Sequence, residues 1–220
     1  SLLSVTTSGA QSYGEDATLN GTYTTTNSAF SVAGTTTLGG GTTVTVGSGA
    51  VTFTGAVNGG NTLAVNSTGA TLFSAAVGGS TALTSLTTDA GGTVSLLSVT
   101  TSGVQSYGEA ATLNGTYTTT NAAFSVAGAT TLGGATTVTV GSGNVTFTGA
   151  VNGANTLAVN STGATLFSAA VGGSTALTSL TTDAGGTVSL LSVTTTGAQS
   201  YGEAATLNGT YTTTNAAFSV

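Results

Sequence analysis

The sequence predicts an all-β chain folded as a parallel β-helix, or β-solenoid, with about 19–20 residues in each coil. Three observations support this fold: a long internal repeat, a shorter apolar spacing inside it, and short runs in which apolar and polar residues alternate. In a β-helix each coil lays short strands on the coil below. A regular short spacing is therefore the pattern that such a fold should leave in a sequence.

The long repeat has a period of 94 residues. The segment SLLSVTTSGAQSYGE begins at Ser1, and close copies begin at Ser95 and Ser189. The first two copies differ at seven positions. We expect one continuous β-solenoid over residues 1–220, with sequence repeats 1–94, 95–188 and 189–220, the third truncated. Because both ends cut across a repeat and no basic leader segment is present, we expect a window from a longer protein.

Apolar residues recur at a shorter interval inside this repeat. The series that begins at Leu19 continues at Leu38, Val57, Val77, Leu96 and Leu113. Five such steps make up one period, so the pattern predicts five coils in each long repeat. Stacked strands are about 4.8 Å apart, so one repeat should extend about 24 Å along the axis.

Short strands are predicted where apolar and polar residues alternate, as in residues 43–46, 51–54 and 63–66. These runs are rich in the β-branched residues Val and Thr, which favour extended backbone. Glycine clusters such as residues 39–41 and 78–79 predict the corners between strands. We expect Thr, Ser and Asn to point outward and Val, Leu, Ala and Phe inward, the largest being Phe30, Phe53 and Phe73.

Tandem immunoglobulin-like β-sandwiches are the alternative fold, since 94 residues is close to the size of one such domain. A sandwich does not predict the shorter spacing inside the repeat. It also usually has a bulky aromatic core, and this chain has no Trp. The sequence therefore favours the β-helix.

The composition excludes several classes of function, because the chain has no Lys, Arg, His, Cys, Met, Trp or Pro. Nucleic acids and anionic lipids are bound mainly through Lys and Arg. Zinc sites and most acid–base or thiolate catalysis need His or Cys. No apolar run is long enough to span a bilayer as a helix. We expect no enzymatic activity, no cofactor, no nucleic-acid partner and no transmembrane segment, and we assign no catalytic, cofactor-binding or metal-ligating residue.

Six acidic residues remain as candidates for a site. The interval from Asp89 to Glu109 equals that from Asp183 to Glu203 and is close to one predicted coil, so each pair could lie on neighbouring coils. No cation of the chain could neutralise such a pair, whereas bound Ca²⁺ could. The sequence favours a simpler interpretation, in which both carboxylates point into water and salt screens them, because their register differs by one residue.

The adjacent acids Glu15 and Asp16 do not form the converging carboxylate pair that glycoside hydrolysis requires. Neighbouring residues of a strand face opposite sides. Moreover, the second and third copies have Ala110 and Ala204 in place of Asp16. This pattern argues against a glycosidase.

Threonine-rich runs could form a flat hydroxyl array of the kind that binds ice. Such an array needs an unbroken column of Thr-x-Thr pairs. One predicted coil beyond Thr43 and Thr45 the chain has Thr62 and Ala64, so the column is predicted to end at once. Asparagines in the N-glycosylation pattern are also present, although this composition produces them easily: Asn20, Asn66, Asn114, Asn144, Asn160 and Asn208.

The units SVTTSGAQSYGEDATLNGTYT, VTFTGAVNGGNTLAVNSTGATLFSAAVGG and LTSLTTDAGGTV resemble the repeat regions of large bacterial exported adhesins of the filamentous haemagglutinin type. The resemblance implies a right-handed parallel β-helix displayed at the cell surface or secreted, serving attachment or biofilm cohesion. We therefore expect a structural fibre or adhesin shaft that associates with itself. The alternative is a module that binds glycans or a surface through its Thr- and Asn-rich faces.

Overall fold

The computed structural model describes all 220 residues and contains 27 strands and no helix. The chain divides into two units, Ser1–Glu109 and Ala110–Val220, within which the strands pair in parallel. Parallel stacking of successive short strands defines a β-solenoid. The predicted all-β parallel β-helix is therefore confirmed. The sandwich alternative is wrong, because the sheets of an immunoglobulin-like sandwich are antiparallel.

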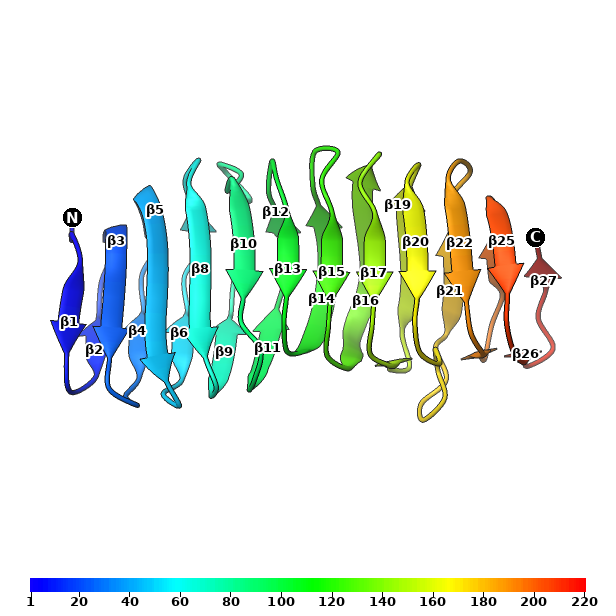
Figure 1. Cartoon of the computed structure of the whole chain (residues 1–220), viewed down its shortest axis with the longest axis horizontal. Coiled ribbons are helices and arrows are strands. Elements are labelled where there is room, and N and C mark those ends of the chain that lie inside the picture. Colours follow the sequence, from blue (N-terminus) through cyan, green and yellow to red (C-terminus); the bar gives the residue numbers. More distant parts are fainter. The chain divides into compact units, whose positions relative to one another are not determined.

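The strands of the first unit, labelled in Figure 1, pair in three parallel ladders, which we number 1 to 3. Ladder 1 contains β1 (Val5–Thr7), β8 (Thr62–Ser67), β10 (Ser85–Thr88), β13 (Gln105–Tyr107) and the second parts of β3 (Ala17–Thr25) and β5 (Thr36–Gly47). Ladder 2 contains β2 (Gln11–Tyr13), β4 (Phe30–Val32), β6 (Val51–Phe53), β9 (Ala70–Phe73) and β11 (Thr93–Leu96). Ladder 3 contains the first parts of β3 and β5, then β7 (Val57–Asn58), a bridge at Val77 and β12 (Val99–Thr100).

The second unit repeats this arrangement with ladders 4, 5 and 6. Ladder 4 contains the first parts of β14 (Ala110–Thr118) and β16 (Thr130–Gly141), then β18 (Val151–Asn152), a bridge at Val171, β23 (Val193–Thr195) and β26 (Tyr211–Thr213). Ladder 5 contains the second parts of β14 and β16, then β19 (Thr156–Ser161), β21 (Ser179–Thr182), β24 (Gln199–Tyr201) and β27 (Phe218–Ser219). Ladder 6 contains β15 (Phe124–Val126), β17 (Val145–Phe147), β20 (Ala164–Phe167), β22 (Thr187–Leu190) and β25 (Ala204–Leu207).

The length of a coil varies from one coil to the next. Along ladder 1, residues in register are Val5, Tyr23, Val44, Val65, Thr88 and Tyr107, so the residue number rises by 18, 21, 21, 23 and 19. The longest step contains the segment 78–84, which connects the bridge at Val77 to β10. Ladder 2 likewise has a long step, from Thr71 to Val94, which also contains the corner at residues 89–92.

These longer coils change the relation between the long repeat and the fold. Each turn of the solenoid has three sides, one on each ladder. From Gln11 in ladder 2 to its copy Gln105 in ladder 1, the chain advances by fourteen sides, so one repeat makes four and two-thirds turns. The prediction of five coils per repeat is wrong for this reason. At about 4.8 Å per coil, one repeat extends about 22 Å rather than 24 Å.

Because fourteen is not a multiple of three, equivalent residues of successive copies lie on different ladders. In the first unit Val5 is in ladder 1, and its copy Val99 is in ladder 3. In the second unit Tyr117 is in ladder 5, and its copy Tyr211 is in ladder 4. Within each unit, a residue therefore lies one third of a turn about the solenoid from its copy.

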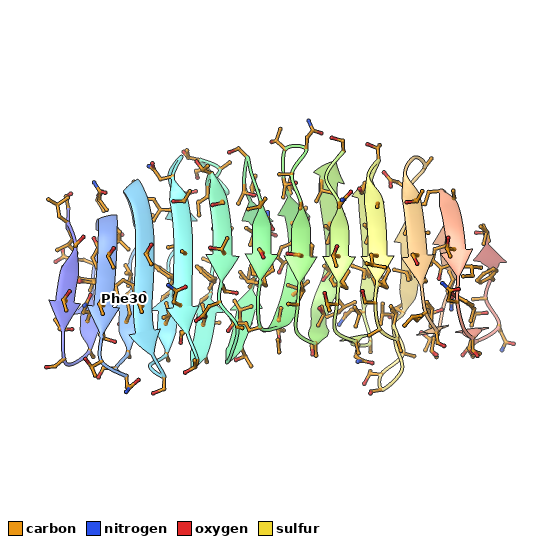
Figure 2. The ribbon with its side chains drawn as sticks, in the orientation of Figure 1. Phe30 is labelled. Carbon is orange, nitrogen blue, oxygen red and sulfur yellow. The ribbon has the colours of Figure 1, made fainter.

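Aromatic side chains fill the interior as the sequence predicts. Phe30 (labelled in Figure 2), Phe53 and Phe73 are buried. The ring centroids of Phe30 and Phe53 are 5.8 Å apart, and those of Phe53 and Phe73 are 5.1 Å apart with nearly parallel planes. We call these three rings an aromatic ladder. The copies of these residues form a second aromatic ladder, with centroid distances of 5.7 and 5.2 Å: Phe124, Phe147 and Phe167. These stacked rings help to hold successive coils together.

The interior is more polar than predicted. Thr36 and Thr42 are buried although Thr was expected to point outward, because they occupy inward positions of the alternating strand β5. Gln11 and Gln105 are buried as well. In each case the side-chain Nε2 donates to a backbone carbonyl, that of Val5 or Val99, and the hydroxyl of the Tyr two positions later donates to Oε1.

The hydroxyl of a buried tyrosine makes two hydrogen bonds at an irregularity in β3. The register between β3 and β5 shifts between Leu19 and Gly21, and Gly21 has a φ of 93°. The N–H of Asn20, in the middle of this bulge, donates to the hydroxyl of Tyr23 at 3.1 Å. That hydroxyl in turn donates to the carbonyl of Leu2 at 2.7 Å. Because the N–H of Asn20 also donates to the carbonyl of Leu2 at 3.1 Å, the Tyr23 hydroxyl adds contacts at the bulge to a ladder hydrogen bond that is already present.

Candidate functional site

The strongest candidate site is an inner corner of the coil that contains a buried carboxyl group. We call it the acidic corner: Thr88, Asp89 and Glu109 in the first unit, and the equivalent Thr182, Asp183 and Glu203 in the second. The prediction that Asp89 and Glu109 lie on neighbouring coils is correct, since β10 pairs with β13 in parallel. The expectation that both side chains point into water is wrong for Glu109, which is 4% exposed.

Strand alternation places Glu109 inside. Gln105, Tyr107, Glu109 and Ala111 are all buried, whereas the residues between them are partly exposed. The backbone N–H of Gly108 donates to the carbonyl of Thr88 at 3.2 Å, so the inward alternation continues past the end of β13. The Glu side chain is thereby fixed over the preceding coil.

The corner packs tightly because residue 108 is a glycine. A Cβ atom at Gly108 would lie 2.7 Å from both the carbonyl carbon and the oxygen of Asp89. Real Cβ atoms do not approach backbone atoms so closely, so any other residue would push the two coils apart. The same approach recurs at Gly202, where a Cβ would lie 2.9 Å from the oxygen of Asp183. The sequence Tyr-Gly-Glu thus allows the close stacking that buries the carboxyl group.

Neither carboxylate oxygen of Glu109 has a hydrogen-bond partner, and the same is true of Glu203. Burial raises the pKa of Glu109 to about 7; proximity to the Thr88 hydroxyl lowers it and the charge of Asp89 raises it. Burial likewise raises the pKa of Glu203, with the same two influences from Thr182 and Asp183. The corner therefore favours the neutral form of this Glu in both units.

Asp89 has a different role. Its Oδ1 accepts a hydrogen bond from the backbone N–H of Ser67 at 2.9 Å, and the side chain is partly exposed. Asp183 makes the same bond to Ser161 at 2.9 Å. Each Asp thus connects its coil to the one below while remaining in contact with water.

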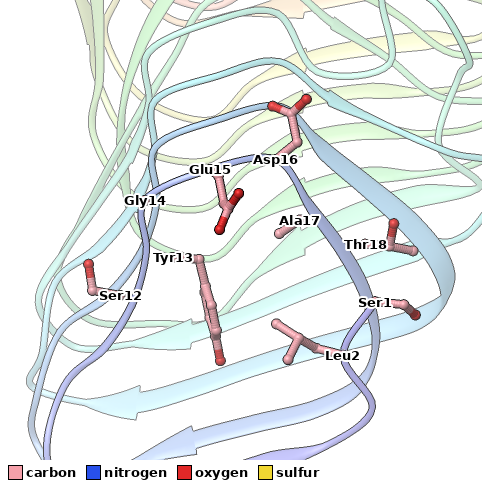
Figure 3. Close-up of a pocket in the computed structure, with 9 residues that line it drawn as sticks. All are labelled: Ser1, Leu2, Ser12, Tyr13, Gly14, Glu15, Asp16, Ala17 and Thr18. Carbon is pink, nitrogen blue, oxygen red and sulfur yellow. The ribbon is translucent and has the colours of Figure 1, made fainter.

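Glu15 and Asp16 line a hollow of about 450 Å³ over the first coil. Figure 3 shows Glu15 on the same side as Tyr13 and Leu2, whereas Asp16 points the opposite way. Oδ1 of Asp16 accepts a hydrogen bond from the N–H of Thr35 on the next coil at 2.7 Å. The two acids therefore face opposite sides, as predicted. The hollow is the uncovered interior of this coil.

The threonine column is short, as predicted, but its register differs from the predicted one. Thr43 pairs with Ala64, not Thr62, because this coil is longer than predicted. On the other side, Thr22 pairs with Thr43. The Thr-x-Thr column therefore covers two coils and ends at Ala64, which confirms that it is not continuous.

The Asn residues of the glycosylation pattern lie mainly in strands. Asn66 is inside β8, and its Nδ2 donates to Oγ1 of Thr45 at 3.2 Å. Asn160 makes the same contact with Thr139 in the second unit. Asn20 lies in the bulge of β3. These side chains contribute to contacts between coils.

No group of three or more His, Cys, Asp or Glu residues is placed to hold a metal ion. No helix of the chain is long and apolar enough to cross a membrane. No protein-family model, curated protein or solved structure matches this chain.

Proposed function

We propose that the chain is a segment of a structural fibre or adhesin shaft, secreted or displayed at the surface of a bacterial cell, where it acts as a rigid spacer or self-assembling filament. The observation that carries this proposal is the continuous parallel pairing of successive coils in each unit. A fold of this kind lengthens without a new core for each repeat, since each coil contacts only its neighbours.

The distribution of polar groups supports a structural role. Outward positions are mostly Thr, Ser and Asn, and several of them connect one coil to the next, as in the 3.1 Å hydrogen bond between the hydroxyls of Ser31 and Ser12. The Phe side chains of the aromatic ladders lie in the interior, where Phe30, Phe53 and Phe73 are buried. Most of the distinctive residues of the repeat thus serve to hold coils together.

The displacement of one third of a turn per repeat gives the shaft a specific character. In a chain of many such repeats, any surface feature of the repeat occurs on all three sides in turn. Three repeats return it to the same side. Such a shaft would offer equivalent contacts to neighbours on every side, which suits a spacer or a bundled filament in an attachment layer or biofilm matrix.

The alternative proposal is a glycan- or surface-binding module that uses the Thr-rich columns. The short column of Thr22 and Thr43 is the feature that favours it. A ligand site usually also presents a concave surface lined by aromatic side chains. The six Phe side chains of the two aromatic ladders are buried instead. We therefore prefer the structural role.

Electron microscopy of chains with two, four and six repeats tests the proposal. A shaft should lengthen by about 22 Å per repeat at constant width. Globules joined by flexible linkers, or a particle of constant length, would refute it. Saturable binding of a polysaccharide by a monomeric chain that forms no filament would favour the alternative.

A further inference from the structure

The acidic corner contains a carboxyl group that no other part of the chain neutralises. Glu109 is 4% exposed and Glu203 is 8% exposed, and all four of their carboxylate oxygens are buried without a hydrogen-bond partner. The chain has no Lys, Arg or His that could form an ion pair with them. An isolated charge is costly to bury. The buried, unpaired carboxyl group occurs at equivalent positions of both units, so it is a regular feature of the repeat.

The surroundings of Glu109 contain one other charged group. The β10 corner contributes the hydroxyl of Thr88, which is itself without a partner, and the carboxylate of Asp89. From β13, the hydroxyl of Tyr107 is already engaged, because it donates to Oε1 of Gln105 at 3.2 Å. The Glu203 corner has the same composition, with Thr182, Asp183 and Tyr201.

This arrangement suits the neutral acid and not the anion. A protonated Glu109 has an O–H group, for which the free hydroxyl oxygen of Thr88 is an acceptor on the adjacent coil. An ionised Glu109 has no donor except that single hydroxyl, and it is repelled by Asp89. Loss of the proton therefore leaves a buried charge with one available donor and adds repulsion from Asp89 between two coils that Gly108 holds closely together.

We propose that the acidic corner is a proton-sensitive latch, in which neutral Glu109 and Glu203 keep adjacent coils closed and their ionisation opens the corner. Burial supports this by raising the pKa of Glu109 to about 7, so that the proton is lost near neutral pH. The latch is a property of the coil, so it goes beyond the proposed fibre and does not depend on it. With one latch per repeat, a long chain would loosen at regular intervals.

Hydrogen exchange of the 220-residue chain between pH 5.5 and 8.5, corrected for the intrinsic pH dependence, measures the opening directly. If Glu109 ionises near its ordinary value of 4.5 in the open corner and near 7 in the closed one, opening at this corner should increase about 30-fold over this range. Opening at the Glu203 corner should increase in the same direction. The change should be confined to peptides that cover residues 88–110 and 182–204. A pH-independent exchange rate at both corners would refute the latch.

The variant Glu109→Gln removes the ionisable group in one unit and leaves Glu203 as an internal reference. Opening at residues 88–110 should then become independent of pH, whereas the second corner keeps its pH dependence. Glu15→Gln is the matched control, since Glu15 is an exposed copy of the same residue. Equal pH dependence of the wild-type and Glu109→Gln corners would overturn the proposal.

Infrared spectroscopy keeps the proposal testable even if the Gln variant does not fold. The wild-type chain should show the carbonyl band of a protonated carboxylic acid at about pH 6, where exposed acids are ionised. Absence of this band would refute the latch. Added Ca²⁺ that closes the wild-type corner at high pH, but not that of Glu109→Gln, would show a cation site and would also refute it.

Discussion

Truncation of Phe53 to alanine should open a cavity in the aromatic ladder at a well-defined place. Phe53 is fully buried, lies 5.8 Å from Phe30 and 5.1 Å from Phe73 between ring centroids, and pairs in register with Val32 and Phe73. A buried Phe→Ala change costs about 3–5 kcal/mol through lost transfer energy and the cavity. Each aromatic pair contributes about 0.5–1.5 kcal/mol beyond the buried area.

The repeat provides a matched variant. Phe147 is the copy of Phe53 in the second unit, is also fully buried, and has neighbouring rings at 5.7 and 5.2 Å. Because the surroundings are the same, Phe53→Ala and Phe147→Ala should reduce local stability by equal amounts. Each loss should be confined to the coils next to the substitution, since a solenoid is stabilised mainly by contacts between neighbours.

Native-state hydrogen exchange, read peptide by peptide, is the appropriate assay because a repeat array need not unfold in two states. We expect protection around residues 30–73 to fall in Phe53→Ala while residues 124–167 keep theirs, with the reverse in Phe147→Ala. A loss below about 1 kcal/mol would contradict the packing described for the ladder. A loss shared equally by both units would contradict stabilisation by neighbouring coils.

Three further changes test other parts of the structure. The folded chain binds the Glu109 proton more tightly than the unfolded chain does, because burial raises the pKa of this group. The free energy of unfolding should therefore fall by about 3 kcal/mol as the pH rises from about 4.5 to about 7, and urea titration at several pH values measures this. Tyr23→Phe should cost about 0.5–1.5 kcal/mol, because the hydroxyl contacts at the bulge are lost while the Asn20 N–H keeps the carbonyl of Leu2 as its partner. Thermal unfolding measures this cost, and an unchanged midpoint would contradict the role of the hydroxyl. Gly108→Ala should separate two coils at Asp89 and lower the midpoint by several degrees, whereas Gly9→Ala, which meets no atom within 4 Å, should leave it unchanged.

The sequence predicts the local structure of the coil well because it depends on neighbouring residues. Alternation of apolar and polar residues identifies the strands around Val44 and Phe53, and the Phe residues predicted for the interior are buried. The number of coils per repeat could not be obtained in this way. It depends on the segments 78–84 and 89–92, which lengthen their coils without altering the apolar pattern elsewhere.

The buried carboxyl group could have been predicted from the sequence. Gln105, Tyr107 and Glu109 have the same parity, so an inward Tyr107 implies an inward Glu109 if the alternation continues past the strand. The expectation of an exposed Glu109 rested instead on the one-residue difference in register between Asp89 and Glu109, which does not determine the direction of either side chain. What could not be predicted is the lack of partners, which depends on which atoms the adjacent coil presents.

The central claim is that lengthened coils give the long repeat fourteen sides rather than fifteen, and disulfide formation tests the lengthened coil most directly. The lengthened coil places Leu72 beside Ser95 in ladder 2, and its copy in ladder 6 places Leu166 beside Ser189. Parallel neighbours in register are about 4.8 Å apart, within the range that a disulfide spans. The chain has no native Cys to interfere.

The double variant Leu72→Cys/Ser95→Cys should therefore form an intramolecular disulfide on mild oxidation, and Leu166→Cys/Ser189→Cys should do so equally. Leu72→Cys/Thr93→Cys is the control, because Thr93 pairs with Ala70 and lies diagonally from Leu72. Mass spectrometry of peptic fragments identifies the linked pairs. Crosslinking of the first two pairs and not of the control is the predicted result. Crosslinking of the control in preference to Leu72→Cys/Ser95→Cys would contradict the register of the lengthened coil.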